Sequence, residues 1–118
     1  MIGQHLILDI KNCTNLILND LEKCKQVFDD VCMKYKLNIL NKSHHLFQPQ
    51  GISVLYLLSE SHISMHSWPE LKMVSLDCYT CSESINNQIH ENMCDDLLNA
   101  FGGEKHRFVI IDRGFDTT

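Results

Sequence analysis

The stretch that decides the fold is ISVLYLLSESHISMHSWPELKMVSLDCY, residues 52–79. Its apolar residues form an almost unbroken run over 52–58, and they then alternate with polar residues over 62–66 and 74–79, on either side of Pro69. A dense apolar run is typical of a buried strand, and alternation is typical of a strand with one buried face. We therefore expect three consecutive strands in the middle of the chain.

One amphipathic helix is expected before these strands in the chain, and another is expected after them. The first spans about 19–36 and the second about 85–101, where Gly102 and Gly103 give a stop signal. In each helix the apolar residues recur three or four positions apart, which places them on one face. The first set is Leu21, Cys24, Phe28, Val31 and Tyr35, and the second is Ile85, Ile89, Met93, Leu97 and Phe101.

Further strands are expected at 4–11, 37–40 and 108–111, which gives the order β-α-β-β-β-β-α-β. This order favours an α+β two-layer sandwich, with both helices on one face of a largely antiparallel sheet. A length of 118 residues suits one domain, so residues 1–118 are expected to fold as a single unit.

Charge and cysteine content narrow the function. A net charge of −5 without a basic run argues against a protein that binds nucleic acid through its phosphates. The apolar stretches fall far short of the roughly 20 residues that span a bilayer, so we expect a cytoplasmic protein with no membrane partner. Six cysteines in such a chain are expected to be reduced thiols, with Cys24 and Cys32 in the core.

Chemistry-bearing side chains concentrate at residues 58–70. Alternation would place Ser61, Ile63 and Met65 on one face of a strand and would place His62, Ser64 and His66 on the other. Three interpretations stay open from these residues alone. They are a polar edge strand, a zinc site that combines His62 and His66 with Cys78 and Cys81, and nucleophilic chemistry at Ser61 or Cys81 with a histidine as proton carrier.

The segment also carries the pattern Glu60-Ser61-His62, then His66, then Trp68-Pro69-Glu70. Together with further matches along the chain, this pattern resembles the short, dimeric type of bacterial and archaeal S-adenosylmethionine decarboxylase proenzymes. Those further matches are Gly3-Gln-His-Leu6, Phe47-Gln-Pro-Gln-Gly51, Asp77-Cys-Tyr-Thr-Cys81 and Arg113-Gly114.

The resemblance implies a protein that makes its own cofactor. The chain would cut itself between Glu60 and Ser61, and Ser61 would become a covalent pyruvoyl group at the start of the new chain 61–118. No metal is implied. The ketone of that group would form a Schiff base with the amine of S-adenosylmethionine and would accept electrons during decarboxylation. The product would be the aminopropyl donor for spermidine synthesis, and the active form would be a homodimer of processed protomers.

The resemblance also assigns roles to individual residues. His66 would transfer protons during self-processing with help from the Ser53 hydroxyl, and Cys81 would protonate the carbanion left after decarboxylation. Phe47 and Trp68 would sandwich the adenine and the sulfonium group of the substrate, and Glu70 would accept hydrogen bonds from its ribose.

Two positions depart from the family pattern, because Val54 and Ser82 stand where members commonly have glycine. Both changes could reshape the substrate pocket. Two alternatives therefore accompany the main hypothesis. One is a pyruvoyl-dependent decarboxylase of arginine or ornithine, and the other is a homologue that binds a nucleoside or a partner without processing itself.

Overall fold

Six strands and two α-helices make up the part of the chain that the computed structural model describes, residues 3–14, 16–82 and 84–115. In chain order they are β1 (Gly3–Lys11), α1 (Leu21–Lys34), β2 (Ile39–Leu46), β3 (Ile52–Leu58), β4 (Ser61–Trp68), β5 (Met73–Thr80), α2 (Asn87–Phe101) and β6 (Lys105–Arg113). A short 3-10 turn, Pro69–Leu71, joins β4 to β5.

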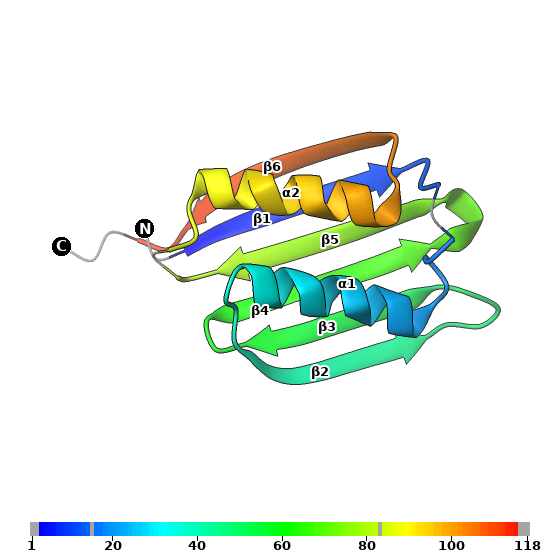
Figure 1. Ribbon diagram of the computed structural model, residues 1–118, viewed down its shortest axis with the longest axis horizontal. Helices are drawn as coiled ribbons and strands as arrows, with labels where there is room; N and C mark the ends of the chain where they lie inside the picture. The colour runs from blue at the N-terminus through cyan, green and yellow to red at the C-terminus, as the bar shows by residue number, and fades with distance from the viewer. Residues whose placement is uncertain (1–2, 15, 83, 116–118) are drawn as a thin grey trace.

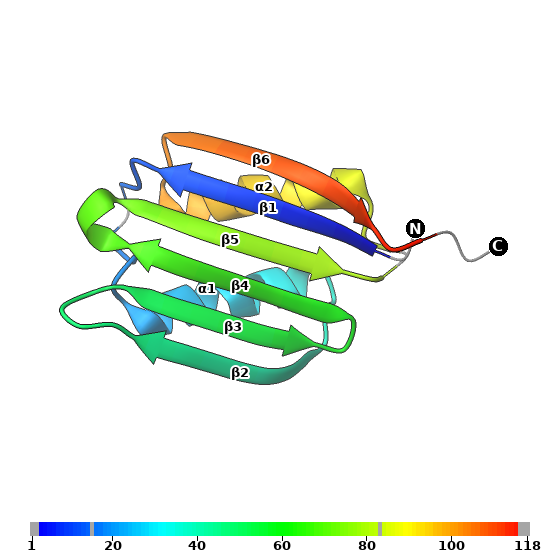
Figure 2. The same ribbon diagram turned by 180° about the vertical axis from the view of Figure 1, so that it is seen from behind.

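The strands form one sheet in the order β2-β3-β4-β5-β1-β6, and all neighbouring strands pair antiparallel. Both helices pack on the same face of this sheet (Figure 1). Within the described residues, the opposite face carries no helix (Figure 2), and we call it the open face. The predicted α+β two-layer sandwich is confirmed.

Alternation along the strands separates the core from the open face. In β5, Val74, Leu76 and Cys78 are buried against the helices, whereas the residues between them are only half-buried. The helices supply the other half of the core through the predicted apolar stripes. Cys24 and Cys32 lie in it, as expected.

Side chains and glycine set the helix ends. Asp20 caps α1 by accepting a hydrogen bond from the Lys23 N–H, and Asn86 caps α2 by accepting one from the Ile89 N–H. These caps explain why each helix begins later than the apolar pattern predicted. Gly102 ends α2 in the left-handed conformation, at a φ of 64°.

The second predicted strand was misplaced. We predicted 37–40 from its apolar residues, but β2 runs over Ile39–Leu46 and includes the polar residues Asn41 to His45. β2 is an edge strand, and nearly all of its side chains are exposed. A strand that buries neither face has no apolar alternation to mark it, so the sequence pattern missed most of its length.

Phe28 offers a test of how the helix layer is held on the sheet. Its ring is fully buried and meets the Tyr56 ring of β3 edge to face, with 5.3 Å between ring centroids. Phe28→Ala removes this contact and leaves a cavity, so we expect a loss of about 3–5 kcal/mol in the free energy of unfolding, measured by urea denaturation. Lys23→Ala, an exposed change on the same helix, serves as the control. A Phe28→Ala protein as stable as that control would contradict this packing.

Candidate active site

Ser61 stands at the tight turn between β3 and β4. It is the first residue of β4, and its φ of 116° is a backbone conformation that non-glycine residues rarely adopt. Ser59 and Glu60 form the turn before it, and both are exposed. The Glu60–Ser61 bond therefore lies at an accessible and conformationally strained point of the chain.

Cys81 lies beside this turn. The register of β4 with β5 pairs Ser61 with Thr80, so Cys81 follows directly at the end of β5. The Ser61 Oγ and the Cys81 Sγ are 3.0 Å apart, and the Cys81 backbone N–H donates a hydrogen bond of 3.1 Å to the Glu60 carbonyl oxygen. The β3–β4 turn and the end of β5 thus bring a hydroxyl, a thiol and a hydrogen-bonded carbonyl together at one place.

His66 lies on the same strand as Ser61 but forms a different pair. It is the cross-strand partner of Ser53 on β3, and the Ser53 Oγ lies 2.6 Å from His66 Nδ1. His66 is exposed and Ser53 is half-buried, and both side chains belong to the open face. Ser53 is therefore the hydroxyl that orients the His66 ring.

Phe47, Trp68 and Glu70 lie at the same end of β3 and β4 as the Ser53–His66 pair. Phe47 lies in the β2–β3 loop, where its N–H donates to the Gly51 carbonyl, and it is half exposed. The Trp68 ring lies 6.5 Å from the His66 ring, and the exposed Glu70 is in the turn that follows β4.

The candidate residues thus fall into two groups at opposite ends of β4. Ser61 with Glu60 and Cys81 forms one half-site, and Ser53 with His66, Phe47, Trp68 and Glu70 forms the other. Five residues at about 3.3 Å each separate Ser61 from His66 by roughly 16 Å. One chain therefore does not bring His66 to Ser61.

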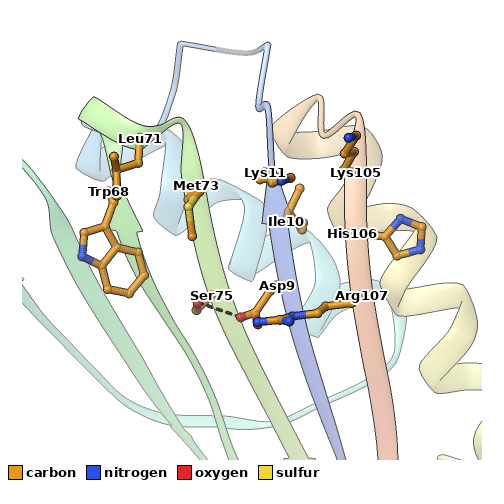
Figure 3. Close-up of a pocket in the computed structure, with 10 residues that line it drawn as sticks. All are labelled: Asp9, Ile10, Lys11, Trp68, Leu71, Met73, Ser75, Lys105, His106 and Arg107. Atoms are coloured by element: carbon orange, nitrogen blue, oxygen red, sulfur yellow. Dashed lines mark hydrogen bonds and ion pairs between the residues drawn. The ribbon is translucent and has the colours of Figure 1, made fainter.

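Each half-site adjoins a hollow in the surface. A cavity of about 260 Å³ beside Glu60 is bordered by the segment Lys36–Asn38 and by Ser82. A larger groove of about 640 Å³ runs over the open face from Trp68 to β6. Figure 3 shows Arg107 reaching from β6 toward Asp9 on β1, where Asp9 accepts hydrogen bonds from Ser75 at 2.8 Å and Arg107 at 3.2 Å.

The zinc hypothesis finds no support in these positions. Cys78 is buried on the helix side of β5, where its Sγ lies 3.8 Å from the sulfur of Met93. Among the residues that the structure describes, no three His, Cys, Asp or Glu side chains converge to hold a metal ion.

None of the described helices is long and apolar enough to cross a bilayer.

One cluster of polar side chains on the open face was not predicted from the sequence. His5 on β1 pairs with Asp77 on β5, at 2.9 Å between Nε2 and Oδ1, and its Nδ1 lies 3.3 Å from the Arg113 guanidinium on β6. Tyr79 lies against His5 and Arg113. The signal for this group is the register of β1 with β5 and β6, which no local pattern in the sequence specifies.

Comparison with known proteins decides the family. The family model described as S-adenosylmethionine decarboxylase matches residues 4–114 of this chain. The chain belongs to the S-adenosylmethionine decarboxylase family. It is 39% identical over 113 residues to the S-adenosylmethionine decarboxylase proenzyme of Thermodesulfovibrio yellowstonii, a match that covers 96% of this chain and 82% of the relative. It is 35% identical to the proenzyme of Clostridium tetani over 84% of this chain and 79% of that relative.

A solved structure shows the same fold in this family of carboxy-lyases. The crystal structure of the adenosylmethionine decarboxylase from Aquifex aeolicus superposes with a TM-score of 0.86 at 23% identity. The match covers 98% of this chain and 92% of that one. The arrangement of two helices on a six-stranded sheet is therefore shared with that protein.

The thiols of the chain should differ sharply in reactivity. Cys81 is half-buried, whereas the other five cysteines are buried. Burial raises the pKa of Cys78 to about 12, and burial together with Asp20 does the same to Cys24. Because the thiolate is the nucleophile, a raised pKa slows alkylation.

We therefore expect iodoacetamide to label Cys81 first in the native protein near pH 7.5, as peptide mass spectrometry would show. The denatured protein, in which all six cysteines should react, is the control. Labelling of Cys78 at a rate similar to that of Cys81 would contradict the burial described above.

Proposed function

We propose that this protein is a pyruvoyl-dependent S-adenosylmethionine decarboxylase that produces its own cofactor by cutting the Glu60–Ser61 bond. The observation that carries the proposal is the geometry at the β3–β4 turn. The Ser61 hydroxyl is next to the Cys81 thiol, and the carbonyl that it must attack already accepts a hydrogen bond from the Cys81 N–H. Decarboxylated S-adenosylmethionine would serve as the aminopropyl donor for spermidine synthesis.

Self-cleavage begins with attack by the Ser61 Oγ on the Glu60 carbonyl carbon. Negative charge then develops on the carbonyl oxygen, where the Cys81 N–H at 3.1 Å stabilises it. Breaking the peptide C–N bond gives an ester. Loss of the Ser61 α-proton then expels the Glu60 carboxylate, and water converts the resulting dehydroalanine into a pyruvoyl group and ammonia. The strained φ of Ser61 favours this reaction, because cleavage releases the strain.

The surroundings of Ser61 fit a pyruvoyl group. This group supplies an electron sink for loss of the substrate carboxylate. Cys81 adjoins the same position and carries a proton that it can deliver to the substrate carbon left by carbon dioxide. In this proposal Cys81 is the proton donor of turnover, and its thiol faces the new N-terminus.

A second copy of the chain would complete each site. His66 is roughly 16 Å from Ser61 along β4, which is too far for proton transfer within one chain. A two-fold axis would place the Ser61 end of one protomer against the His66 end of the other, and it would do so twice. The open face supports such a homodimer because it exposes between 39% and 50% of the apolar side chains Leu55, Leu57, Trp68, Val109 and Ile111.

The same homodimer would provide the substrate site. Trp68 is half exposed beside His66, and Phe47 is half exposed in the β2–β3 loop at the same end of the strands. Together they would enclose the adenine and the sulfonium group by stacking and cation–π attraction. Glu70 is exposed in the adjoining turn and would accept hydrogen bonds from the ribose hydroxyls. Aromatic side chains at this end favour a nucleoside substrate over arginine or ornithine. Release of carbon dioxide from each of the three compounds would distinguish them.

Replacement of Ser61 tests self-cleavage. Ser61→Ala removes the attacking oxygen, so we expect a single uncut chain in a denaturing gel after long incubation. Ser59→Ala removes an exposed hydroxyl two residues away and should leave cleavage unchanged. Cys81→Ala should still be cut, with turnover reduced by at least about a hundredfold. Two fragments from Ser61→Ala would refute the proposed chemistry.

Co-expression of two variants tests whether the site is shared between protomers. Ser61→Ala cannot be cut, and His66→Ala should be cut slowly because it lacks the proton-transfer group. In a mixed dimer, Ser61 of the His66→Ala chain would meet the intact His66 of the partner subunit. We therefore expect the His66→Ala chain, identified by a mass tag, to be cut faster in the mixture than alone. Equal cleavage in both cases would show that His66 does not act across the interface.

A further inference from the structure

The end of β5 beside the Ser61 half-site carries a polar side chain on its buried side. Thr80 is the last residue of β5, and its side chain is 1% exposed, on the helix side of the sheet. It is the cross-strand partner of Ser61 on β4, and Cys81 follows it directly in the chain. The placement of Thr80 therefore decides where the Cys81 N–H and thiol lie.

His90 on α2 is the partner of this buried hydroxyl. Its ring is fully buried, and its Nε2 lies 3.4 Å from the Thr80 Oγ1. Among the described residues, neither of these two atoms has another hydrogen-bond partner, and His90 Nδ1 has none. Buried polar groups without a partner are rare, so this contact satisfies two groups that would otherwise be unpaired.

The charge state of His90 suits this contact. Burial lowers the pKa of the ring, and the nearby His5 lowers it further. The ring is therefore neutral at pH 7, so that one of its nitrogens donates and the other accepts a hydrogen bond. A neutral imidazole can pair with a threonine hydroxyl, which also donates and accepts.

A second polar contact holds the same end of α2. Gln4 is the cross-strand partner of Thr80 on β1, and its Nε2 donates a hydrogen bond of 2.6 Å to Asn87 Oδ1. Asn87 is the first residue of α2, and His90 lies about one turn further along. Side chains thus fix the start of α2 to β1 and β5 at the strand ends next to Cys81.

We propose that His90 is a positioning residue that holds Thr80 in place and thereby aligns Cys81 with the β3–β4 turn. The hydrogen bond anchors the end of β5, so that the Cys81 nitrogen stays 3.1 Å from the Glu60 carbonyl oxygen and the Cys81 Sγ stays 3.0 Å from the Ser61 Oγ. His90 acts through Thr80, from the helix side of the sheet. The effect on self-cleavage rests on the proposed function, whereas the alignment of Cys81 does not.

Amide hydrogen exchange of Cys81 tests the alignment without any need for self-cleavage. The exchange rate would be measured by NMR in the uncut Ser61→Ala protein. Thr80→Val removes the hydroxyl and keeps the shape of the side chain, so the Cys81 N–H should exchange up to about tenfold faster. Thr80→Ser keeps the hydroxyl and should leave the exchange rate unchanged.

Thr14→Val is the matched control for this measurement. It removes a threonine hydroxyl that donates a hydrogen bond to the Gly102 carbonyl at the other end of α2. It should leave the exchange of Cys81 unchanged. Exchange in Thr80→Val at the rate of the parent protein would overturn the inference, as would equally fast exchange in Thr14→Val.

Rates of self-cleavage separate positioning from stability. The chain would be pulse-labelled during expression, and its conversion to two fragments would be followed on a denaturing gel. Thr80→Val and His90→Leu should each be cut up to about tenfold more slowly than the wild type. The double variant leaves neither polar group unpaired, so its free energy of unfolding, measured in the Ser61→Ala background, should exceed that of either single variant. Its cleavage should stay slow, because the hydrogen bond is still missing.

A conservative replacement completes the test. His90→Gln supplies an amide in place of the ring Nε2, so it should be cut faster than His90→Leu. Cleavage that recovers in the double variant together with stability would overturn the positioning role. An uncut wild-type chain would overturn the proposed function, and the exchange rates would still decide the alignment of Cys81.

Discussion

The antiparallel register of β3, β4 and β5 is the constraint on which the site depends. It pairs Ser61 with Thr80 and so brings Cys81 to the β3–β4 turn, and it pairs Ser53 with His66 at the other end of the same strands. A slip of one residue would turn every side chain of β4 to the opposite face. The buried Ile63 and Met65 oppose such a slip, because they would lose their places under the helices. Core packing thus fixes where the two half-sites lie along the strands.

The two faces of the sheet carry different kinds of side chain. The helix side holds the core, including five of the six cysteines, which are buried. The open face holds His66, Tyr79, Trp68, the His5–Asp77 hydrogen bond and the Asp9–Arg107 ion pair, together with exposed apolar side chains. A face with this mixture is suited to a polar site enclosed by a subunit contact. The separation of the two half-sites along β4 agrees with the proposed homodimer, in which Ser61 of one protomer would meet His66 of the partner subunit.

Much of the fold followed from the sequence because burial leaves a pattern. β3 was predicted with its observed bounds, since an apolar run lies between Gly51 and the polar Ser59. β2 was misplaced because an edge strand buries neither face. The segment that carries Ser61 and His66 was recognisable, but its division into two half-sites was not, because periodicity gives the face of a side chain and not its position along the sheet. The contact of Ser61 with Cys81 depends on the exact register of β4 with β5, and the place of Tyr79 beside His5 depends on the pairing of β5 with the distant β1. Single-sequence patterns specify neither.

The intact mass of the purified wild-type protein under denaturing conditions tests the central claim most directly. Self-cleavage predicts two species, residues 1–60 and residues 61–118, with the second lighter than its encoded sequence by the change from serine to a pyruvoyl group. A single species with the mass of the uncut chain, unchanged after prolonged incubation, would contradict the claim that the β3–β4 turn is a self-processing site.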